Sequence, residues 1–492
     1  MTLTWRVVNI ASFSFFLAKV MNMKVLFVHP EHYLCIGIPG GIAALAATVN
    51  NRGHQVGLFD TCFLKTEKHF NKMEISRKQH GGMGTSDTGG ISMFKPTEYT
   101  IEDLVANDPI IESYEIEFQK KIDEFQPDVI ALSCMTSTFD FACSLVRGVR
   151  HNAIVVVGGV HATIAYSDCM SQDCIDYAFV GEADNVFVDF LDKLDRNEDP
   201  TTTDNLVYRT RSGIVKRNAN APRVELNDLP CPHWGLFDER HLFRPFEGKV
   251  YKGSFYSQSR GCPMQCTYCV DPVISDLTGG HTGYFRIQRP DVTIAHLTEL
   301  KEKFGATWYK FSDDTFLLPK VDHLQSLSDG LRPLGIQFGC SVMTNTITEE
   351  KVKIAKEMGC VAMSVGVEAG NPEIRKSLKR NYSDERLIKT LGFVKDHGLK
   401  LSTFNIIGCP DESRKNVFET IELNRKLRTD SCNVYIMFPY PGTPIQVASG
   451  KPIRDESGKI VPVEMAKYLG LSKMGSDELQ GLLDTFNIYL HS

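Results

Sequence analysis

The chain has 492 residues, of which 42% are hydrophobic and 23% are charged, and its formal net charge is −6. This length exceeds one ordinary domain, so two or three domains are expected. The composition is that of a globular protein, and the small acidic excess gives no support to nucleic-acid binding. Most of the 14 cysteines are scattered singly and suggest no disulfide framework, which favours a reducing cytoplasm.

Residues 1–23 precede the first clear strand pattern and form an N-terminal extension of open role. The apolar stretch within them is about a dozen residues long, too short to span a bilayer. One basic residue, Arg6, precedes this stretch, which is a poor match to a signal peptide. We favour either a start at Met23 or a peripheral helix, and a membrane anchor is the less favoured alternative.

Residues 24–200 alternate between strand and helix patterns. Strands are predicted at residues 24–29, 55–60, 129–133, 154–157 and 177–180, and helices at residues 40–52, 139–150 and 185–194. This alternation predicts a Rossmann-like, doubly wound parallel sheet, that is, an α/β fold. Such sheets bind ligands beyond the carboxyl ends of their strands. The ligand-side segments are therefore residues 29–41, 133–138, 158–163 and 181–184.

An insertion at residues 63–125 separates the second and third strands. Residues 81–90 are glycine-rich and predict a loop, and residues 100–125 are polar and predict helix. Long insertions in compact domains are often functional, so a lid over the ligand is one interpretation.

Residues 201–249 are predicted to connect two domains. Residues 205–216 read as a hairpin that turns at Ser212-Gly213, and residues 229–237 are broken by prolines and extended. Strands and helices alternate again over residues 250–445, and residues 446–492 form a short helical segment. About six strand–helix units fit the second region, which favours a partial (β/α)6 TIM-type barrel over a complete eight-stranded one.

Three cysteines in one short stretch form the most specific motif of the chain. They are Cys262, Cys266 and Cys269, with Tyr268 just before the third. Three thiolates on one loop can hold three irons of a 4Fe–4S cube, which leaves one iron open to a further molecule. Zinc is the alternative, but it needs a fourth Cys or His nearby, and the first such residue is His281.

This motif and its Arg260-Gly261 lead-in resemble the radical S-adenosylmethionine (radical SAM) enzymes, whose open iron binds SAM. The preceding Rossmann-like region, with Gly158-Gly159 and Gly181-Glu182, looks like the cobalamin-binding members of that superfamily. These members include methyltransferases and relatives such as the anaerobic magnesium-protoporphyrin ester cyclase type. The resemblance covers residues 24–445. The sequence contains no second cysteine cluster, so we expect no auxiliary iron–sulfur clusters.

The resemblance implies a set of cobalamin contacts at the strand ends of the first domain. They are Ser133, Thr136, Ser137, Gly158, Gly159, His161, Gly181 and Glu182. The paired glycines would let the backbone approach a bulky ligand, although a tight strand–helix turn would use them equally well. Many cobalamin proteins supply a histidine to cobalt from a D-x-H-x-x-G motif, which residues 29–37 do not match. We therefore expect no histidine on the lower face of cobalt, with His32 as the alternative ligand.

The resemblance also implies SAM contacts in the second domain. Besides the cluster cysteines, they are Tyr268, Asp313, Asp314, Glu368, Gly408 and Pro410. Many relatives carry an arginine and an aspartate late in the strand that here contains Met343 and Asn345, so that polar contact is in doubt.

The implied function is that of a cobalamin-dependent radical SAM enzyme. The reduced cluster would cleave SAM to a 5′-deoxyadenosyl radical, and methylcobalamin would pass a methyl group to an unactivated carbon, or to phosphorus, of a small-molecule substrate. One alternative is an oxidoreductase or cyclase that uses cobalamin without methyl transfer, and another is a non-catalytic cobalamin or redox sensor. The implied cofactors are a 4Fe–4S cluster, SAM and cobalamin.

The expected partners are a small-molecule substrate and an external electron donor such as flavodoxin or ferredoxin. Neither nucleic acid nor a membrane is expected as a partner, and the expected location is the cytoplasm. The sequence does not name the substrate.

Overall fold

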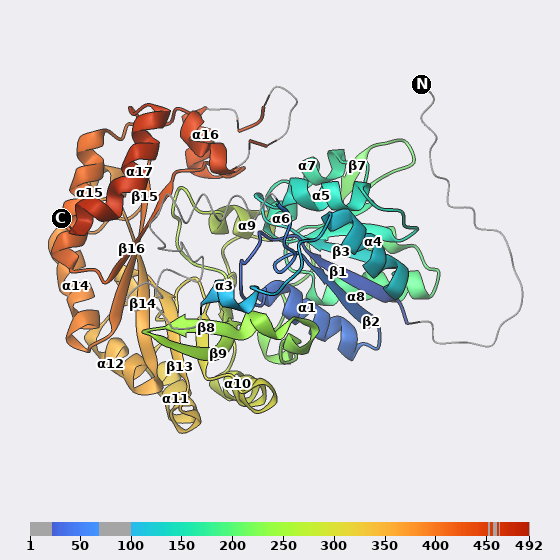
Figure 1. Cartoon of the computed structure of the whole chain (residues 1–492), viewed down its shortest axis with the longest axis horizontal. Helices are drawn as coiled ribbons and strands as arrows, with labels where there is room; N and C mark the ends of the chain where they lie inside the picture. The colour runs from blue at the N-terminus through green and yellow to red at the C-terminus, as the bar shows by residue number, and fades with distance from the viewer. Residues whose placement is uncertain (1–21, 68–99, 451–452, 456–459, 462, 492) are drawn as a thin grey trace, which may run out of the picture.

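The computed structural model describes residues 22–67, 100–450, 453–455, 460–461 and 463–491. The apolar stretch of the N-terminal extension and the glycine-rich residues 81–90 lie outside the described residues. Figure 1 shows two α/β halves, the N-terminal half in blue to green and the C-terminal half in green to red. All 14 cysteines are described and none of them forms a disulfide, and no described helix is both long and apolar enough to cross a bilayer.

The N-terminal half is a seven-stranded sheet in the order β2-β1-β3-β4-β5-β6-β7. The first five strands in this order are parallel, and β6 and β7 are antiparallel. Its strands are β1 (Lys24–His29), β2 (Gln55–Asp60), β3 (Val129–Ser133), β4 (Ile154–Gly158), β5 (Tyr177–Phe179), β6 (Leu206–Arg209) and β7 (Val215–Arg217). The doubly wound sheet is therefore confirmed, and the predicted hairpin extends it rather than lying apart from it.

Helices cover both faces of this sheet because its strands are apolar on both sides. Helices α1 (Gly40–Asn51) and α8 (Asp184–Asp195) pack on one face, against side chains such as Phe27. Helices α4 (Tyr114–Phe125), α5 (Phe139–Arg147) and α7 (Tyr166–Ser171) pack on the other, against side chains such as Leu26. The short helices α3 (Ile101–Leu104) and α6 (Val160–Ile164) precede α4 and α7 in the chain.

The C-terminal half is a curled seven-stranded sheet in the order β16-β15-β14-β13-β12-β9-β8. Its parallel strands are β9 (Lys249–Tyr256), β12 (Trp308–Phe311), β13 (Gln337–Val342), β14 (Cys360–Glu368), β15 (Lys400–Ile407) and β16 (Ser431–Ile436). These six strands confirm the partial barrel. The antiparallel strand β8 (Phe243–Phe246) was not predicted, and it pairs with β9 at the open edge.

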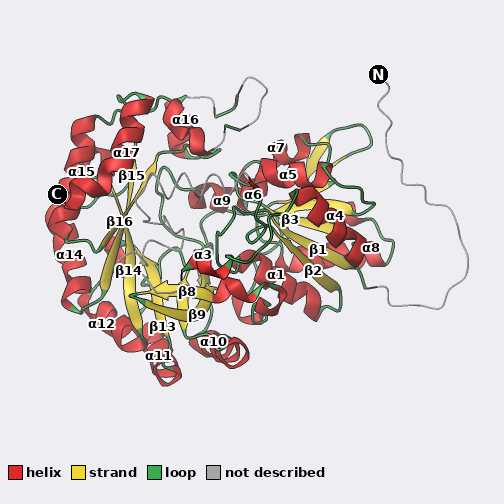
Figure 2. Ribbon diagram, in the orientation of Figure 1, coloured by secondary structure: helices red, strands yellow, loops and turns green. Residues whose placement is uncertain are grey.

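Helices form the outer layer of the barrel, as Figure 2 shows. They are α10 (Pro290–Phe304), α11 (Val321–Leu331), α12 (Glu349–Met358), α14 (Asp384–Asp396), α15 (Arg414–Leu427) and α17 (Ser476–His491), with the short α9 (Asp271–Leu277), α13 (Pro372–Ser377) and α16 (Pro444–Ser449) in the connections. Local signals explain their bounds. In α12, for example, the Thr348 side chain accepts from the Lys351 amide at the start, and Gly359 ends the helix with φ 112°.

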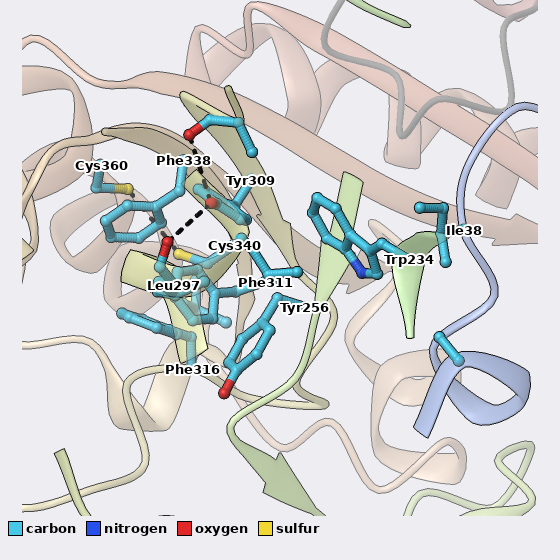
Figure 3. Close-up of a cluster of buried hydrophobic side chains, with 14 of the residues drawn as sticks. Ile38, Trp234, Tyr256, Leu297, Tyr309, Phe311, Phe316, Phe338, Cys340 and Cys360 are labelled. Atoms are coloured by element: carbon cyan, nitrogen blue, oxygen red, sulfur yellow. Dashed lines mark hydrogen bonds between the residues drawn. The ribbon is translucent and has the colours of Figure 1, made fainter. Parts of the chain in front are cut away.

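Aromatic side chains fill the layer between the barrel strands and the helices. Tyr309, Phe311, Phe316 and Phe338 pack together there, as Figure 3 shows, and the ring centroids of Phe311 and Phe338 lie 5.0 Å apart. The Tyr309 hydroxyl donates to the Leu297 carbonyl at 3.3 Å, so its polar end is satisfied. Because strand residues alternate between faces, Lys310 lies on the inner side of the barrel.

The C-terminal helix α17 belongs to the barrel. Its apolar face packs on β15, β16 and α15 through Leu479, Leu482, Phe486 and Leu490. The boundary predicted at residue 445 separated α17 from the barrel. The sequence of a short amphipathic helix does not indicate which element the helix packs against. We therefore propose that the second domain runs from β8 to the end of α17.

Phe486→Ala should destabilise the protein by about 3–5 kcal/mol, because it opens a cavity under a side chain that is fully buried. Ile488→Ala is the matched control on the same helix, since Ile488 is 66% exposed and its truncation should cost under about 0.5 kcal/mol. Urea unfolding followed by circular dichroism measures both. Equal losses in the two variants would contradict the packing of α17.

Candidate active site

The three cysteines of the motif line one cavity of about 640 Å³ at the mouth of the barrel. Cys262 and Cys266 are buried, and Cys269 is half-buried. Their loop is anchored by β10 (Ser259–Arg260), which pairs antiparallel with β11 (Arg286–Ile287). At Gly261, with φ 84°, a Cβ would lie 2.5 Å from the Tyr284 carbonyl oxygen, so the loop can enter the site only with glycine there.

The donor set of this loop fits an iron–sulfur cluster. Burial raises the pKa of Cys262 to about 12 and also raises the pKa values of Cys266 and Cys269. Buried thiols of this kind become thiolates when a metal ion supplies the positive charge. The Asp271 amide donates to the Cys269 sulfur at 3.5 Å, which would help to hold that thiolate. Three thiols on one cavity wall match the three-cysteine ligand set that leaves one iron open.

Tyr268 and Glu368 meet on the same cavity, together with Arg380, which the sequence did not single out. The Tyr268 hydroxyl donates to Glu368 Oε1 at 2.7 Å, and Arg380 Nη2 lies 3.0 Å from the same oxygen. Arg380 Nη1 is buried and, among the described residues, has no hydrogen-bond partner. A guanidinium nitrogen in this state is suited to a carboxylate such as that of SAM.

The spacing of Gly366 and Glu368 has a steric reason. Glu368 adopts φ 67°, a left-handed conformation that is costly for a non-glycine residue. Its side chain folds back over Gly366, where a Cβ would lie 2.1 Å from Glu368 Oε1 and 3.1 Å from Arg380. Burial raises the pKa of Glu368, and Arg380 and Tyr268 oppose that rise. Arg375, an arginine close to Glu368 in sequence, pairs with Asp384 instead.

The two neighbouring aspartates take different positions. Asp314 lines the cavity, whereas Asp313 is 2% exposed and accepts a short hydrogen bond from the Ser259 hydroxyl. Burial raises the pKa of Asp313 to about 6 and that of Asp314 to about 7. Asp314 is therefore the better placed of the two for the SAM ammonium group, and Asp313 secures the entry of the cysteine loop.

Gly408 and Pro410 are not among the residues that line this cavity. The Gly408 and Cys409 amides donate to Glu412 Oε2 at 2.5 and 3.1 Å, so the turn at residues 408–412 is closed by its own glutamate. The α-carbon of Gly408 faces Leu479 of α17. Their contact with SAM stays a prediction. Met343 does line the cavity, and Asn345 contacts Met264.

A second cavity, of about 420 Å³, lies between the two halves of the molecule. Five of the predicted cobalamin residues line it: Ser133, Gly158, Gly159, Gly181 and Glu182. Thr136, Ser137 and His161 do not line it, and neither does His32. His161 is 1% exposed, lies 3.3 Å from both Thr136 Oγ1 and Asp168, and packs on Phe139. His161 is thus packed among other protein groups, and its contact with cobalamin stays a prediction.

The barrel contributes the opposite wall of the second cavity through the end of β9 and the residues that follow it. Gln258 lines this wall and is 1% exposed. Among the described residues, neither its side-chain oxygen nor its side-chain nitrogen has a hydrogen-bond partner. A buried amide of this kind needs a partner, and the amide side chains of a corrin ring provide one. The cavity therefore fits cobalamin. Gln258 was not predicted from the sequence, because its only distinguishing feature there is its position shortly before the cysteines.

Ion pairs tie the cysteine loop to the N-terminal sheet. Arg260 donates to both carboxylate oxygens of Asp184, at 2.6 and 3.0 Å. Arg286 of β11 pairs with Glu182, which also lies 3.9 Å from Arg260. Glu182 was predicted as a cobalamin contact, and the structure gives it these two arginines as partners. Both pairs bridge the segments that line the two cavities.

Two family models match the chain. Residues 256–423 match the Radical SAM superfamily, and residues 93–191 match the B12 binding domain. An uncharacterised methyltransferase of Pyrococcus horikoshii is 28% identical over 330 residues, which is 66% of this chain and 70% of that protein. The cytidylyl-2-hydroxyethylphosphonate methyltransferase of Streptomyces wedmorensis is 23% identical over 433 residues, which is 79% of this chain and 73% of that protein.

The fold is shared with a solved structure. The radical SAM methyltransferase TsrM from Kitasatospora setae, solved with cobalamin and a 4Fe–4S cluster, superposes with a TM-score of 0.65 at 14% identity. The superposition covers 87% of this chain and 78% of TsrM. At this identity the likeness establishes the architecture of the two halves.

A chain that joins a radical SAM domain to a B12-binding domain is a cobalamin-dependent radical SAM enzyme. This chain therefore carries the two domains that its motifs resembled, a radical SAM domain and a B12-binding domain. Its cofactors are a 4Fe–4S cluster, SAM and cobalamin. The match to an enzyme class argues against the non-catalytic sensor. The contacts of individual residues with the cofactors stay predictions.

Cys269→Ala should lower the iron content of the anaerobically reconstituted protein well below the about four irons per chain of a cubane cluster. SAM cleavage should be lost as well, because the loop supplies only three thiolates and the cluster needs all of them. Cys174→Ala is the control, since Cys174 is half-buried in the N-terminal half and lines neither cavity. Retained SAM cleavage in Cys269→Ala would contradict the cluster assignment.

Glu412→Gln should flatten the dependence of stability on pH. Burial raises the pKa of Glu412 to about 7 in the folded protein, against an ordinary 4.5. The folded state therefore holds a proton that the unfolded state releases, so wild-type stability falls as pH rises from about 4.5 to 7. The loss by pH 8 is up to about 3 kcal/mol.

The glutamine variant cannot ionise, so its melting temperature should change less between pH 5 and pH 8 than that of wild type. Its amide oxygen can keep the Gly408 and Cys409 hydrogen bonds. Thermal unfolding of both proteins at the two pH values provides the measurement, and parallel pH profiles would show that Glu412 is ionised in the folded protein.

Proposed function

We propose that this enzyme is a methyltransferase that adds a methyl group to an unactivated carbon, or to phosphorus, of a small-molecule substrate. The observation that carries the proposal is the shared wall between its two cavities. Gln258 and Arg260 line the cavity that fits cobalamin, and Cys262, two residues further on, lines the cavity of the cysteine motif. This arrangement would hold cobalamin, the methyl carrier, and the cluster, the radical source, on opposite sides of the short segment 258–262.

The chemistry itself belongs to the bound cofactors, which supply a radical that removes hydrogen and a methyl group that is transferred. The chain's own residues hold and orient them. The three cysteines bind the cluster, Arg380 offers its free nitrogen to the SAM carboxylate, and Asp314 offers a carboxylate to the SAM ammonium group. The names of the two relatives, both methyltransferases, support this proposal over the cyclase alternative.

The inner surface of the barrel leaves room for a small substrate. Ser341, Ser364 and Gly366 line it, and their small side chains leave the cavity open. Lys310, which is also on the inner side of the barrel, donates to the Ser364 hydroxyl at 3.3 Å. TsrM has been solved with tryptophan as its substrate, which is consistent with a substrate of this size in the shared fold. An external electron donor, such as flavodoxin or ferredoxin, is part of the proposal.

Anaerobic protein carrying the cluster and cobalamin, supplied with a chemical reductant, methyl-labelled SAM and the small-molecule fraction of a cell extract, tests the proposal. Label should appear in a small molecule and should require both cobalamin and Cys269. SAM cleavage without a methylated product would instead favour the cyclase or oxidoreductase alternative.

Glu368→Gln should weaken SAM binding about tenfold, because it removes the charge of a buried carboxylate in the proposed SAM site. The glutamine can still accept from Tyr268, so iron and cobalamin content should stay normal. Asp396→Asn, on the exposed surface of α14, is the charge-matched control. Equilibrium dialysis with labelled SAM gives the affinities, and an unchanged affinity together with a lower melting temperature would assign Glu368 a structural role.

A further inference from the structure

Three metal-ligand side chains meet at the carboxyl edge of the N-terminal sheet. His29 ends β1, Asp60 ends β2, and the two residues are register partners in the parallel pair. Cys62 follows two residues later and is buried. One ligand atom from each of the three side chains lies within 4.8 Å of the others. None of the three lines either cavity described above.

The Asp60 carboxylate is held in place from two sides. The Cys62 amide donates to Oδ1 at 2.9 Å, and His241 Nε2 lies 2.6 Å from Oδ2. The Gly37 amide donates to His241 Nδ1 at 3.0 Å, so the proton of this imidazole is on Nε2 and points at Asp60. Carboxylates that bind metals are commonly oriented by outer hydrogen bonds of this kind.

The other two donors are less firmly held than Asp60. Among the described residues, no hydrogen bond to the His29 imidazole is found. The Cys62 thiol lies 3.4 Å from the Cys35 carbonyl and beside the Asp60 carboxylate.

The carboxyl groups at this point favour a cation. Asp60 is one of the three side chains, and Glu31, which is 7% exposed, adds a second carboxyl group two residues after His29.

We propose that His29, Asp60 and Cys62 bind one divalent metal ion of the zinc class. Nitrogen, oxygen and sulfur together are the ligand set that Zn²⁺ accepts, whereas hard cations prefer oxygen alone. Ligand atoms around a tetrahedral zinc lie about 3.3–3.8 Å apart at the usual bond lengths. Side-chain rotations on metal binding would have to bring the three atoms, now within 4.8 Å of one another, to this spacing. Binding forms three metal–ligand bonds, releases the Cys62 thiol proton to solvent and leaves the fourth position to water.

The site would fasten the connector to the sheet. His241 lies in the 3₁₀ turn Glu239–Leu242 of the connector, while His29 and Asp60 belong to the sheet. A metal on Asp60 would therefore fix β1, β2 and the connector in one unit. This role is independent of the methyl-transfer chemistry, and it rests on no contact with the proposed substrate.

The test uses the full chain with its cluster and cobalamin in place, loaded with zinc sulfate and then dialysed. Mass spectrometry gives zinc per chain, and X-ray absorption at the zinc edge gives the ligand atoms. Wild type should retain about one zinc with one sulfur neighbour and otherwise nitrogen and oxygen. His29→Ala and Cys62→Ala should each retain less than a tenth of that. Cys231→Ala, a half-buried cysteine of the connector, should retain all of it.

Three sulfur neighbours would place the zinc on the cluster cysteines and overturn the proposal. Wild type that retains no zinc, or equal zinc in all variants, would equally overturn it and leave a hydrogen-bonded network alone. The wild-type absorption spectrum decides even where a variant fails to fold. Because the readout is zinc, its failure is distinct from a failure of the methyl-transfer proposal.

Discussion

The ion pairs between the cysteine loop and the N-terminal sheet set the geometry on which both cavities depend. Arg260 binds Asp184 through two nitrogens, and it stands directly before Gly261 and the first cysteine. Asp184 is 5% exposed, so removal of its arginine would leave a buried charge without its main partner. Such losses cost about 3–5 kcal/mol. The distance between the two cofactor sites is therefore fixed by charges that neither domain could satisfy alone.

The barrel separates packing from chemistry by strand alternation. Outward side chains such as Tyr309 and Phe338 build the aromatic layer under the helices. Inward positions are small or polar, as at Ser341 and Ser364, so the inside stays open. The strained backbone of Glu368 lies on this open side, where a preorganised carboxylate is useful and packing does not demand it.

The connector contributes more contacts to the two halves than its sequence suggests. Its hairpin extends the first sheet, Trp234 packs against Tyr309 and Phe304 of the barrel half, and His241 orients Asp60 at the proposed zinc site. The hydrophobic core is accordingly continuous across the two halves. Rigid placement of one half on the other follows from this continuity together with the ion pairs.

The sequence by itself determined the local features of this protein. Buried strands such as β1 and β3, the three-cysteine loop and the glycine turns Gly158-Gly159 and Gly181 follow from short-range pattern, and the structure places them as expected. Tertiary structure decided everything that depends on distant partners. Arg380 joins Tyr268 across 112 positions of the chain, and Gln258 is left unpaired by the meeting of two domains. Edge strand β8 and helix α17 likewise gain their roles from neighbours far away in sequence, because contact energies between remote segments leave no periodic signal.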